Sequence, residues 1–199
     1  MTARRRLAPE ERRTLLVEAG ARLFAERAYD DVLMEDVATA AGVSRALLYR
    51  HFPGKRELFA AVYRQAAEHL LGHTVLTPGQ PLAGQLAAGL DAHFDYFEAN
   101  SQAVITANRT LGGDPAIQAI IAEELGELRQ RILDAIGLTG ARRTLASSIL
   151  MGWLTFVRIV TIDWLDMRPC PRTELREICI AALLGALEPL IVEEDSFTA

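Results

Sequence analysis

Residues 32–55 read VLMEDVATAAGVSRALLYRHFPGK, and this segment predicts two short helices joined by a tight turn. Gly42 stands at the turn, where the end of a helix often needs a positive φ angle. Ser44 follows and is suited to cap the second helix, because its hydroxyl can accept a hydrogen bond from a backbone N–H two or three residues further on. This layout is typical of a helix-turn-helix, in which the second helix lies in the major groove of DNA.

The second helix of this segment, residues 45–51, should bury one side and expose the other. Leu48 and Phe52 fall together on a helical wheel, so we expect them to face a small core shared with the first helix. The candidates for contact with DNA are then Ser44, Arg45, Ala46, Leu47, Tyr49, Arg50, His51, Lys55 and, in the N-terminal arm, Arg5.

These candidates differ in what they can recognise. Arg45 or Arg50 can hydrogen-bond guanine through two donors, which is worth ~1–3 kcal/mol of discrimination. The pair at 46–47 suits thymine methyl groups. Tyr49 and His51 can donate to phosphates, which fixes the register of the protein on DNA but reads no sequence.

Other interpretations of the same residues stay open. Lys55 begins a helix whose free backbone N–H groups and dipole would also attract phosphate, but a short basic and aromatic segment is often only a solvated surface. His51 has a structural role as its alternative. The arm formed by Arg4 to Arg6 is either a contact to DNA or a solubilising tail.

Composition and charge are consistent with a basic head on an acidic body. The 199 residues carry a net charge of −5, and half of them are hydrophobic. Residues 1–65 contain 12 basic and nine acidic side chains, whereas residues 66–199 contain nine basic and 17 acidic side chains. A basic N-terminal part suits a surface that faces phosphates, and the high apolar content indicates a large buried interface or an apolar cavity.

The periodicity of apolar residues is helical throughout and predicts an all-α fold of about nine helices. The expected helices are 9–27, 34–41, 45–51, 55–71, 82–99, 101–110, 115–136, 141–166 and 172–190. The helix over 141–166 is apolar nearly all round, so it needs cover on more than one face. We therefore expect a homodimer through the last two helices, with a monomer core as the alternative.

The chain resembles the TetR family of transcriptional repressors. The resemblance rests on Leu23-Phe24, Tyr29, Glu35-Asp36-Val37-Ala38, Ala41-Gly42-Val43-Ser44, Leu48-Tyr49-Arg50-His51-Phe52 and Lys55-Arg56-Glu57-Leu58-Phe59. It implies a DNA-binding domain over 1–54, and a ligand-binding and dimerisation domain over 55–199. It also implies that a ligand bound in the second domain spreads the two DNA-binding heads of a dimer and releases a palindromic operator.

Three positions depart from the family pattern. Ala28 stands where the family usually has glycine, and a positive φ retained there would cost ~1–2 kcal/mol. Leu33 replaces a threonine or serine that would cap the next helix and touch phosphate. Ala46-Leu47 replaces a Gly-Thr pair, which removes a hydroxyl suited to phosphate.

A ligand pocket is expected among the helices between residue 55 and residue 166. Aromatic side chains and a few polar groups on otherwise apolar helices suit a pocket for a mostly apolar small molecule. The residues chosen as ligand contacts are His93, Phe94, Phe97, Asn108, Trp153 and Phe156, each with ordinary packing as its alternative.

The sequence contains no pattern that we interpret as catalytic, and we expect no cofactor, no metal and no enzyme activity. There is no G-x-S-x-G, no phosphate-binding glycine loop and no HExxH. Arg158 within the apolar segment 145–162 favours a buried helix over a membrane span, and we expect a cytoplasmic protein. The alternatives are an activator, a regulator without a ligand, and a helical binding protein or enzyme whose head no longer binds DNA.

Overall fold

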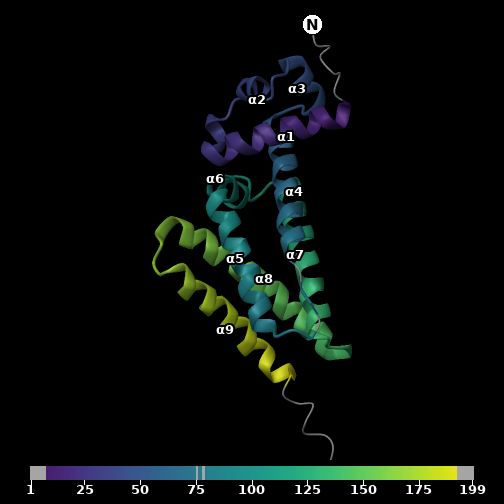
Figure 1. The fold of residues 1–199 in the computed structure, drawn as a ribbon, viewed down its shortest axis with the longest axis vertical. Helices are drawn as coiled ribbons and strands as arrows, with labels where there is room; N and C mark the ends of the chain where they lie inside the picture. The colour runs from purple at the N-terminus through teal and green to yellow at the C-terminus, as the bar shows by residue number, and fades with distance from the viewer. Residues whose placement is uncertain (1–7, 75, 78, 192–199) are drawn as a thin grey trace, which may run out of the picture. The chain divides into compact units, whose positions relative to one another are not determined.

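The structure is a computed structural model that describes residues 8–74, 76–77 and 79–191, and these residues form helices and connecting loops (Figure 1). The elements are α1 (Pro9–Glu26), η1 (Tyr29–Asp31), α2 (Met34–Ala40), α3 (Arg45–His51), α4 (Lys55–His73), α5 (Leu82–Ala99), α6 (Ser101–Ile105), η2 (Thr106–Thr110), α7 (Pro115–Ile136), α8 (Gly140–Met167) and α9 (Arg172–Ile191). The expected all-α class is confirmed, with nine α-helices in the described part of the chain. Arg5 and the rest of the N-terminal arm lie outside the described residues.

The chain forms two compact units. One contains the residues up to Ala66 together with Asn100–Ile120, and the other contains Ala67–Ala99 and the residues from Ile121 onward. The first part of α4 therefore packs with the helices that precede it. The division of the chain into functional domains at 54/55 stays a prediction.

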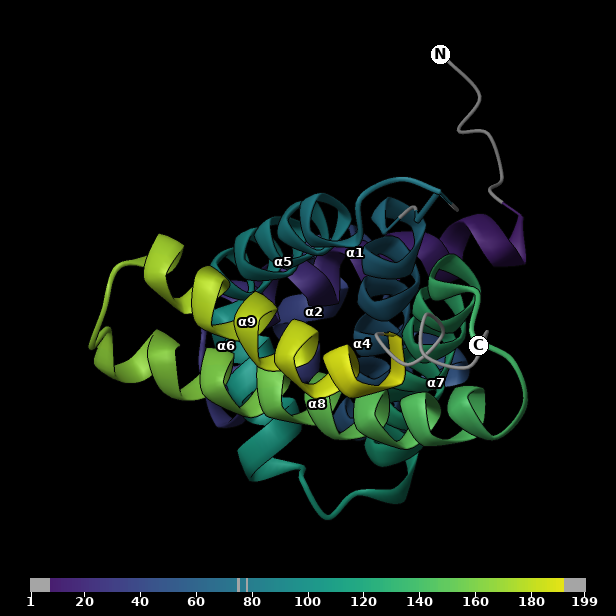
Figure 2. The ribbon, with the colours of Figure 1, turned by 90° about the horizontal axis from the view of Figure 1, so that it is seen from below.

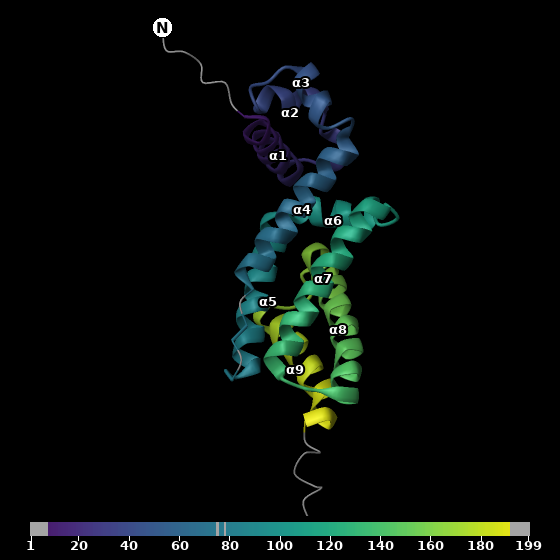
Figure 3. The ribbon, with the colours of Figure 1, turned by 90° about the vertical axis from the view of Figure 1, so that its right-hand side faces the viewer.

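An aromatic cluster forms the core of the first unit. The Phe59 ring meets the Phe24 ring edge to face at 5.0 Å, and it meets the Tyr29 ring in the same way at 5.4 Å. Leu48 of α3 is completely buried. In this unit α1 contacts α2, and α2 contacts α3 (Figure 3). The buried side of the helix-turn-helix thus packs on the core that contains this cluster, and its other side is left exposed.

In the second unit α8 and α9 lie side by side, and both contact α5 (Figure 2). The indole N–H of Trp153 on α8 donates to the carbonyl of Cys179 on α9 at 2.7 Å, which joins the two helices inside the core. Arg172 on α9 pairs with Asp91 and Asp95 on α5. Among the described helices, α8 is the one long and apolar enough to cross a membrane, but 44% of its most apolar window is buried inside the protein.

The predicted helix over 101–110 is instead divided. Its second half is a π-helical turn, in which the backbone N–H of Leu111 donates to the carbonyl of Thr106 at 2.8 Å. The turn ends at Thr110, and a Cβ atom on Gly112, two residues further on, would lie 2.6 Å from the backbone oxygen of Asn108. Only glycine permits so close an approach to the carbonyl four residues earlier in the chain.

Candidate DNA-binding face and ligand pocket

The start of α3 has the geometry that the sequence predicts. Gly42 has a φ of 65°, in the left-handed region that favours glycine. The Oγ of Ser44 accepts a hydrogen bond from the backbone N–H of Leu47 at 3.2 Å. This cap fixes the direction in which α3 leaves the turn.

The side chains of α3 divide between a buried and an exposed side, as expected. Leu48 is 0% exposed and Phe52, just beyond the helix, is 3% exposed. The exposed residues are Arg45, Ala46, Tyr49 and Arg50, whereas Leu47 and His51 are half-buried. The structure thus brings most of the predicted DNA contacts together on one side of a single short helix.

Arg45 forms an ion pair with Glu35 of α2 on the surface of the first unit. The two side chains are 64% and 42% exposed, so the pair is well solvated. Such pairs contribute little net free energy, and the guanidinium can exchange Glu35 for another acceptor. This carboxylate lies ten residues from Arg45 in the chain, and no local pattern in the sequence predicts the pair.

Lys55 has a structural role that the sequence did not reveal. Its Nζ donates to the backbone carbonyls of Tyr29 at 2.7 Å and Asp30 at 3.2 Å, and it lies 4.5 Å from the centre of the Tyr29 ring. The ammonium group therefore holds the η1 turn to the start of α4. The predicted phosphate contact of Lys55 stays a prediction.

His51 and Ala28 also differ from a simple interpretation of the motif. The Nε2 atom of His51 is buried and has no hydrogen-bond partner in the structure.

Ala28 has φ −59° and ψ 147°, which is extended backbone that any residue adopts. The replacement of glycine at this position therefore causes no backbone strain. Leu33 is 56% exposed and forms no side-chain cap for α2.

Asp114 connects the start of α7 to α4 within the first unit. Its Oδ1 accepts from the backbone N–H groups of Ala116 at 2.9 Å and Ile117 at 3.3 Å, as expected for a helix cap. Its Oδ2 pairs with Nε of Arg56 at 3.1 Å. This ion pair joins residues 58 positions apart in the chain and could not be read from local sequence.

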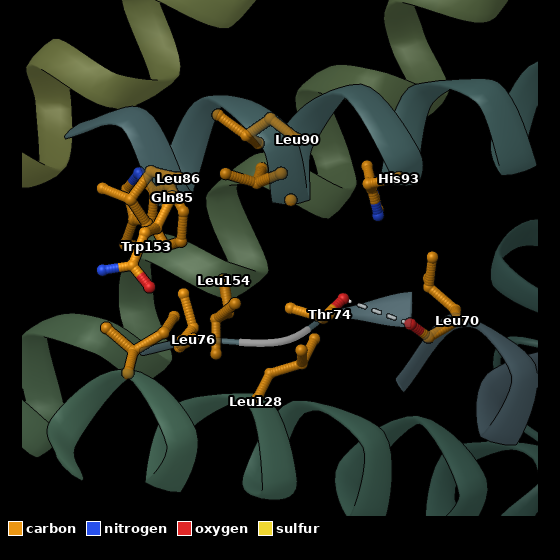
Figure 4. Close-up of a pocket in the computed structure, with 13 residues that line it drawn as sticks. Leu70, Thr74, Leu76, Gln85, Leu86, Leu90, His93, Leu128, Trp153 and Leu154 are labelled. Carbon is orange, nitrogen blue, oxygen red and sulfur yellow. Dashed lines mark hydrogen bonds between the residues drawn. The ribbon is translucent and has the colours of Figure 1, made fainter. Parts of the chain in front are cut away.

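A pocket lies within the second unit, between α4, α5, α7 and α8 (Figure 4). It encloses about 510 Å³, including the part open to solvent. The residues that line it are Leu70, Thr74, Leu76, Gln85, Leu86, Gly89, Leu90, His93, Leu128, Ile132, Trp153, Leu154 and Val157. Its wall is thus mostly aliphatic, with few polar groups.

The predicted ligand contacts are only partly brought together. His93 and Trp153 line the pocket. Phe94 and Phe97 are buried at 0% and 2% exposure and are not among its lining residues. Phe156 is 36% exposed and is also absent from the lining.

Asn108 is the one predicted ligand contact that belongs to the other compact unit. Its Nδ2 donates to the carbonyl of Val104 at 2.8 Å, within the segment that contains the π turn.

The sequence does not identify the leucines of the pocket wall, because their spacing is that of any buried helical stripe. No signal in the sequence separates a pocket leucine from a core leucine.

A buried charged pair lies between α7 and α8. Nη1 of Arg158 is 3.3 Å from Oε2 of Glu124, and the two side chains are only 6% and 4% exposed. Burial raises the pKa of the Glu124 carboxyl, although the adjacent guanidinium acts in the opposite direction. The guanidinium also lies 5.7 Å from the centre of the Phe97 ring.

His93 is the titratable residue in the pocket wall. Its ring centre is 3.8 Å from that of Phe97. Burial, together with the nearby positive charge of Arg158, lowers the pKa of His93 to about 3, so the imidazole is neutral near pH 7. Among the described residues, no group of three histidine, cysteine or acidic side chains could hold a metal ion.

Comparison with known proteins agrees with the helix-turn-helix and the helical fold. The family model described as bacterial regulatory proteins, tetR family, matches residues 16–62. Over 99 residues the chain is 35% identical to the HTH-type transcriptional activator FasR of Mycolicibacterium smegmatis, covering 49% of this chain and 45% of FasR. Over 90 residues it is 30% identical to the HTH-type transcriptional repressor KstR2 of the same organism, covering 42% and 44%.

The likeness to these two proteins spans less than half of their length. A tetR-family transcriptional regulator from Streptomyces coelicolor has a similar structure over nearly the whole chain. The TM-score is 0.81 at 25% sequence identity, and the match covers 95% of this chain and 86% of that one.

Proposed function

Because this chain belongs to the TetR family of bacterial regulatory proteins, we propose that it is a DNA-binding transcriptional regulator. Its main activity would be that of a repressor that leaves a palindromic operator when a small molecule binds. Such regulators are generally not enzymes, and we infer that the protein acts in the cytoplasm, where the DNA is.

The exposed side of α3 is the observation that carries this proposal. Ser44 caps the helix, and Leu48 anchors it in the core of the first unit. Arg45, Tyr49 and Arg50 are left exposed on the surface. A capped short helix with exposed arginines and an exposed tyrosine suits base contacts combined with phosphate contacts.

Two features of α8 and α9 support a homodimer. Large apolar side chains are exposed on both helices: Ile159 on α8 is 53% exposed, and Ile178 on α9 is 48% exposed. Exposed apolar groups on adjacent helices are typical of surfaces that pair with another protein. A two-fold dimer would present two α3 helices to two half-sites of a palindrome.

Activation of transcription is the alternative to repression. FasR, one of the relatives, is named an activator, whereas KstR2 is named a repressor. Transcription from the regulated promoter, measured with and without the protein, distinguishes the two. A rise in transcription when the gene is deleted supports the repressor.

A footprint on DNA tests the proposed function. The purified protein should protect a palindromic site in the intergenic DNA beside its own gene. Tyr49→Ala should weaken binding to all sequences, whereas Arg50→Ala should also relax base preference, at a cost of ~1–3 kcal/mol at one position of each half-site. Binding is measured by fluorescence anisotropy at several salt concentrations.

Arg22→Ala is the matched control, because it removes one exposed arginine from α1 of the same unit. It should leave the base preference unchanged. An unaltered operator affinity in the Tyr49→Ala, Arg50→Ala double variant contradicts the assignment of α3 as the DNA-reading helix. Absence of any footprint, together with turnover of a small molecule, favours the binding protein or enzyme.

A further inference from the structure

The polar groups in the pocket wall are already bonded to the protein, with one exception. The side chain of Gln85 bonds to the backbone carbonyls of Thr77 and Gln80, both at 3.1 Å. The N–H of Trp153 donates to Cys179, and the hydroxyl of Thr74 donates to the carbonyl of Leu70 at 3.1 Å. The hydrogen-bond donors of these three side chains are therefore already used.

The exception is Nε2 of His93. This atom is buried and has no hydrogen-bond partner, although its ring lines the pocket (Figure 4). A buried polar atom without a partner is unfavourable, and such an atom in a native protein calls for an explanation. The His93 ring is buried and packs against the Phe97 ring at a tilt of 36°, with 3.8 Å between the ring centres, so the protein restricts the position of Nε2 before a ligand arrives.

The pocket wall offers no charge to a ligand. Among the described residues that line it there is no acidic side chain, no lysine and no arginine, and His93 is neutral near pH 7. The cation that acts on His93, Arg158, is paired with Glu124 in a buried contact. Moving an ionised group into such surroundings without a counter-charge is strongly unfavourable.

We propose that this pocket binds an uncharged, largely apolar molecule through one hydrogen bond to Nε2 of His93, and that alcohols are the ligand class. A hydroxyl can both donate and accept, so it satisfies Nε2 in either tautomer of the neutral ring. The apolar part of the molecule would lie against the leucine side chains of α4, α5 and α7. This inference rests on the proposed function only in assigning the pocket to the regulatory ligand.

Calorimetric titration of the full-length protein at neutral pH tests this ligand class. The probes are 1-decanol, decanoate and decylamine, which share a chain and differ in the charge of the head group. 1-Decanol should bind at least about tenfold more tightly than either ion, a difference of about 1.4 kcal/mol. His93→Phe keeps a planar ring but removes the nitrogen, and it should weaken 1-decanol binding about fivefold.

Thr74→Val is the matched control, because it changes a pocket hydroxyl whose proton is already donated to Leu70. It should leave the affinity for 1-decanol within about twofold. In the wild-type protein, the ¹⁵N signal of His93 Nε2 should shift when 1-decanol is added, which is independent of any folding defect in a variant. Tighter binding of decanoate, or an unmoved His93 signal, overturns the proposal.

The two proposals fail separately. These titrations contain no DNA, so binding of 1-decanol through His93 supports the ligand class whatever the operator does. If 1-decanol binds in this way and the operator complex persists, the ligand-release part of the proposed function fails alone. If the footprint is found and 1-decanol does not bind, the ligand class fails alone.

Discussion

The ammonium group of Lys55 is held by two backbone carbonyls and the face of an aromatic ring. A lysine at the start of a helix beside a predicted DNA-binding surface is readily interpreted as a phosphate contact. The sequence could not reveal the alternative, because the carbonyls of Tyr29 and Asp30 lie 25 or more positions away. By contrast, the cap formed by Ser44 is local, and the sequence predicts it correctly.

Lys55→Ala should therefore reduce stability as well as DNA affinity. Two charge-assisted hydrogen bonds are lost, and the free energy of unfolding should fall by about 1–3 kcal/mol. The measurement is equilibrium unfolding in urea, with Arg22→Ala as the control for loss of a positive charge. Unchanged stability, accompanied by a large loss of operator affinity, would mean that Lys55 contacts a DNA phosphate and does not stabilise the η1 turn.

Between elements, α2 places a carboxylate beside the DNA-reading helix. Glu35 pairs with Arg45, and in a complex its negative charge would lie close to the DNA that the arginine contacts. Glu35→Gln should release the guanidinium and remove one repulsive charge, so operator affinity should rise about threefold at low salt and less at high salt.

Asp31→Asn is the control for this prediction, because it removes an exposed negative charge from η1 in the same unit. Anisotropy titrations of the two variants against wild type measure the difference. A gain of equal size in both variants would assign the effect to net charge, and a loss of affinity in Glu35→Gln would show that the pair orients Arg45 for binding.

The sequence predicts helix boundaries where their causes are local, and it fails where they depend on residues distant in the chain. Capping residues and apolar spacing predict α1 to α5 and α7 to α9 within a few residues. The segment 101–110 was expected as one helix, since nothing in its composition excludes a regular turn. The π turn and the close approach at Gly112 depend on how the segment packs, which propensity does not record.

At the scale of the whole molecule, the proposed dimer makes a direct prediction. Ile178→Glu places a charge in the exposed apolar surface of α8 and α9, and burying it in an interface would be costly. The variant should be monomeric in light scattering coupled to size-exclusion chromatography. Its operator affinity should fall about a hundredfold or more, because two half-sites can no longer be bound together.

Ala122→Glu is the matched control, since it introduces the same charge at an exposed position of α7. It should leave the mass and the operator affinity unchanged. A dimeric Ile178→Glu protein would show that the contact lies elsewhere on the surface.

The composition of the whole chain predicts a cavity or an interface but does not say which leucines form it. His93 and Trp153 interrupt an aliphatic pattern with polar and aromatic side chains, and both line the pocket, while their contact with a ligand stays a prediction. Phe94 and Phe97 share that property but are buried and are not among the lining residues of the pocket. Which side of α5 meets the cavity depends on the neighbouring helices and not on α5 alone.

The position of Trp153 gives the protein an optical probe of its own. Its indole forms part of the pocket wall, and Trp164 is the other of the two tryptophans in the chain. A Trp164→Phe background would leave a single emitter in contact with any occupant. Changes in its emission would report filling of the cavity in real time, without a label and before anything is known of the occupant or of the promoter that responds to it.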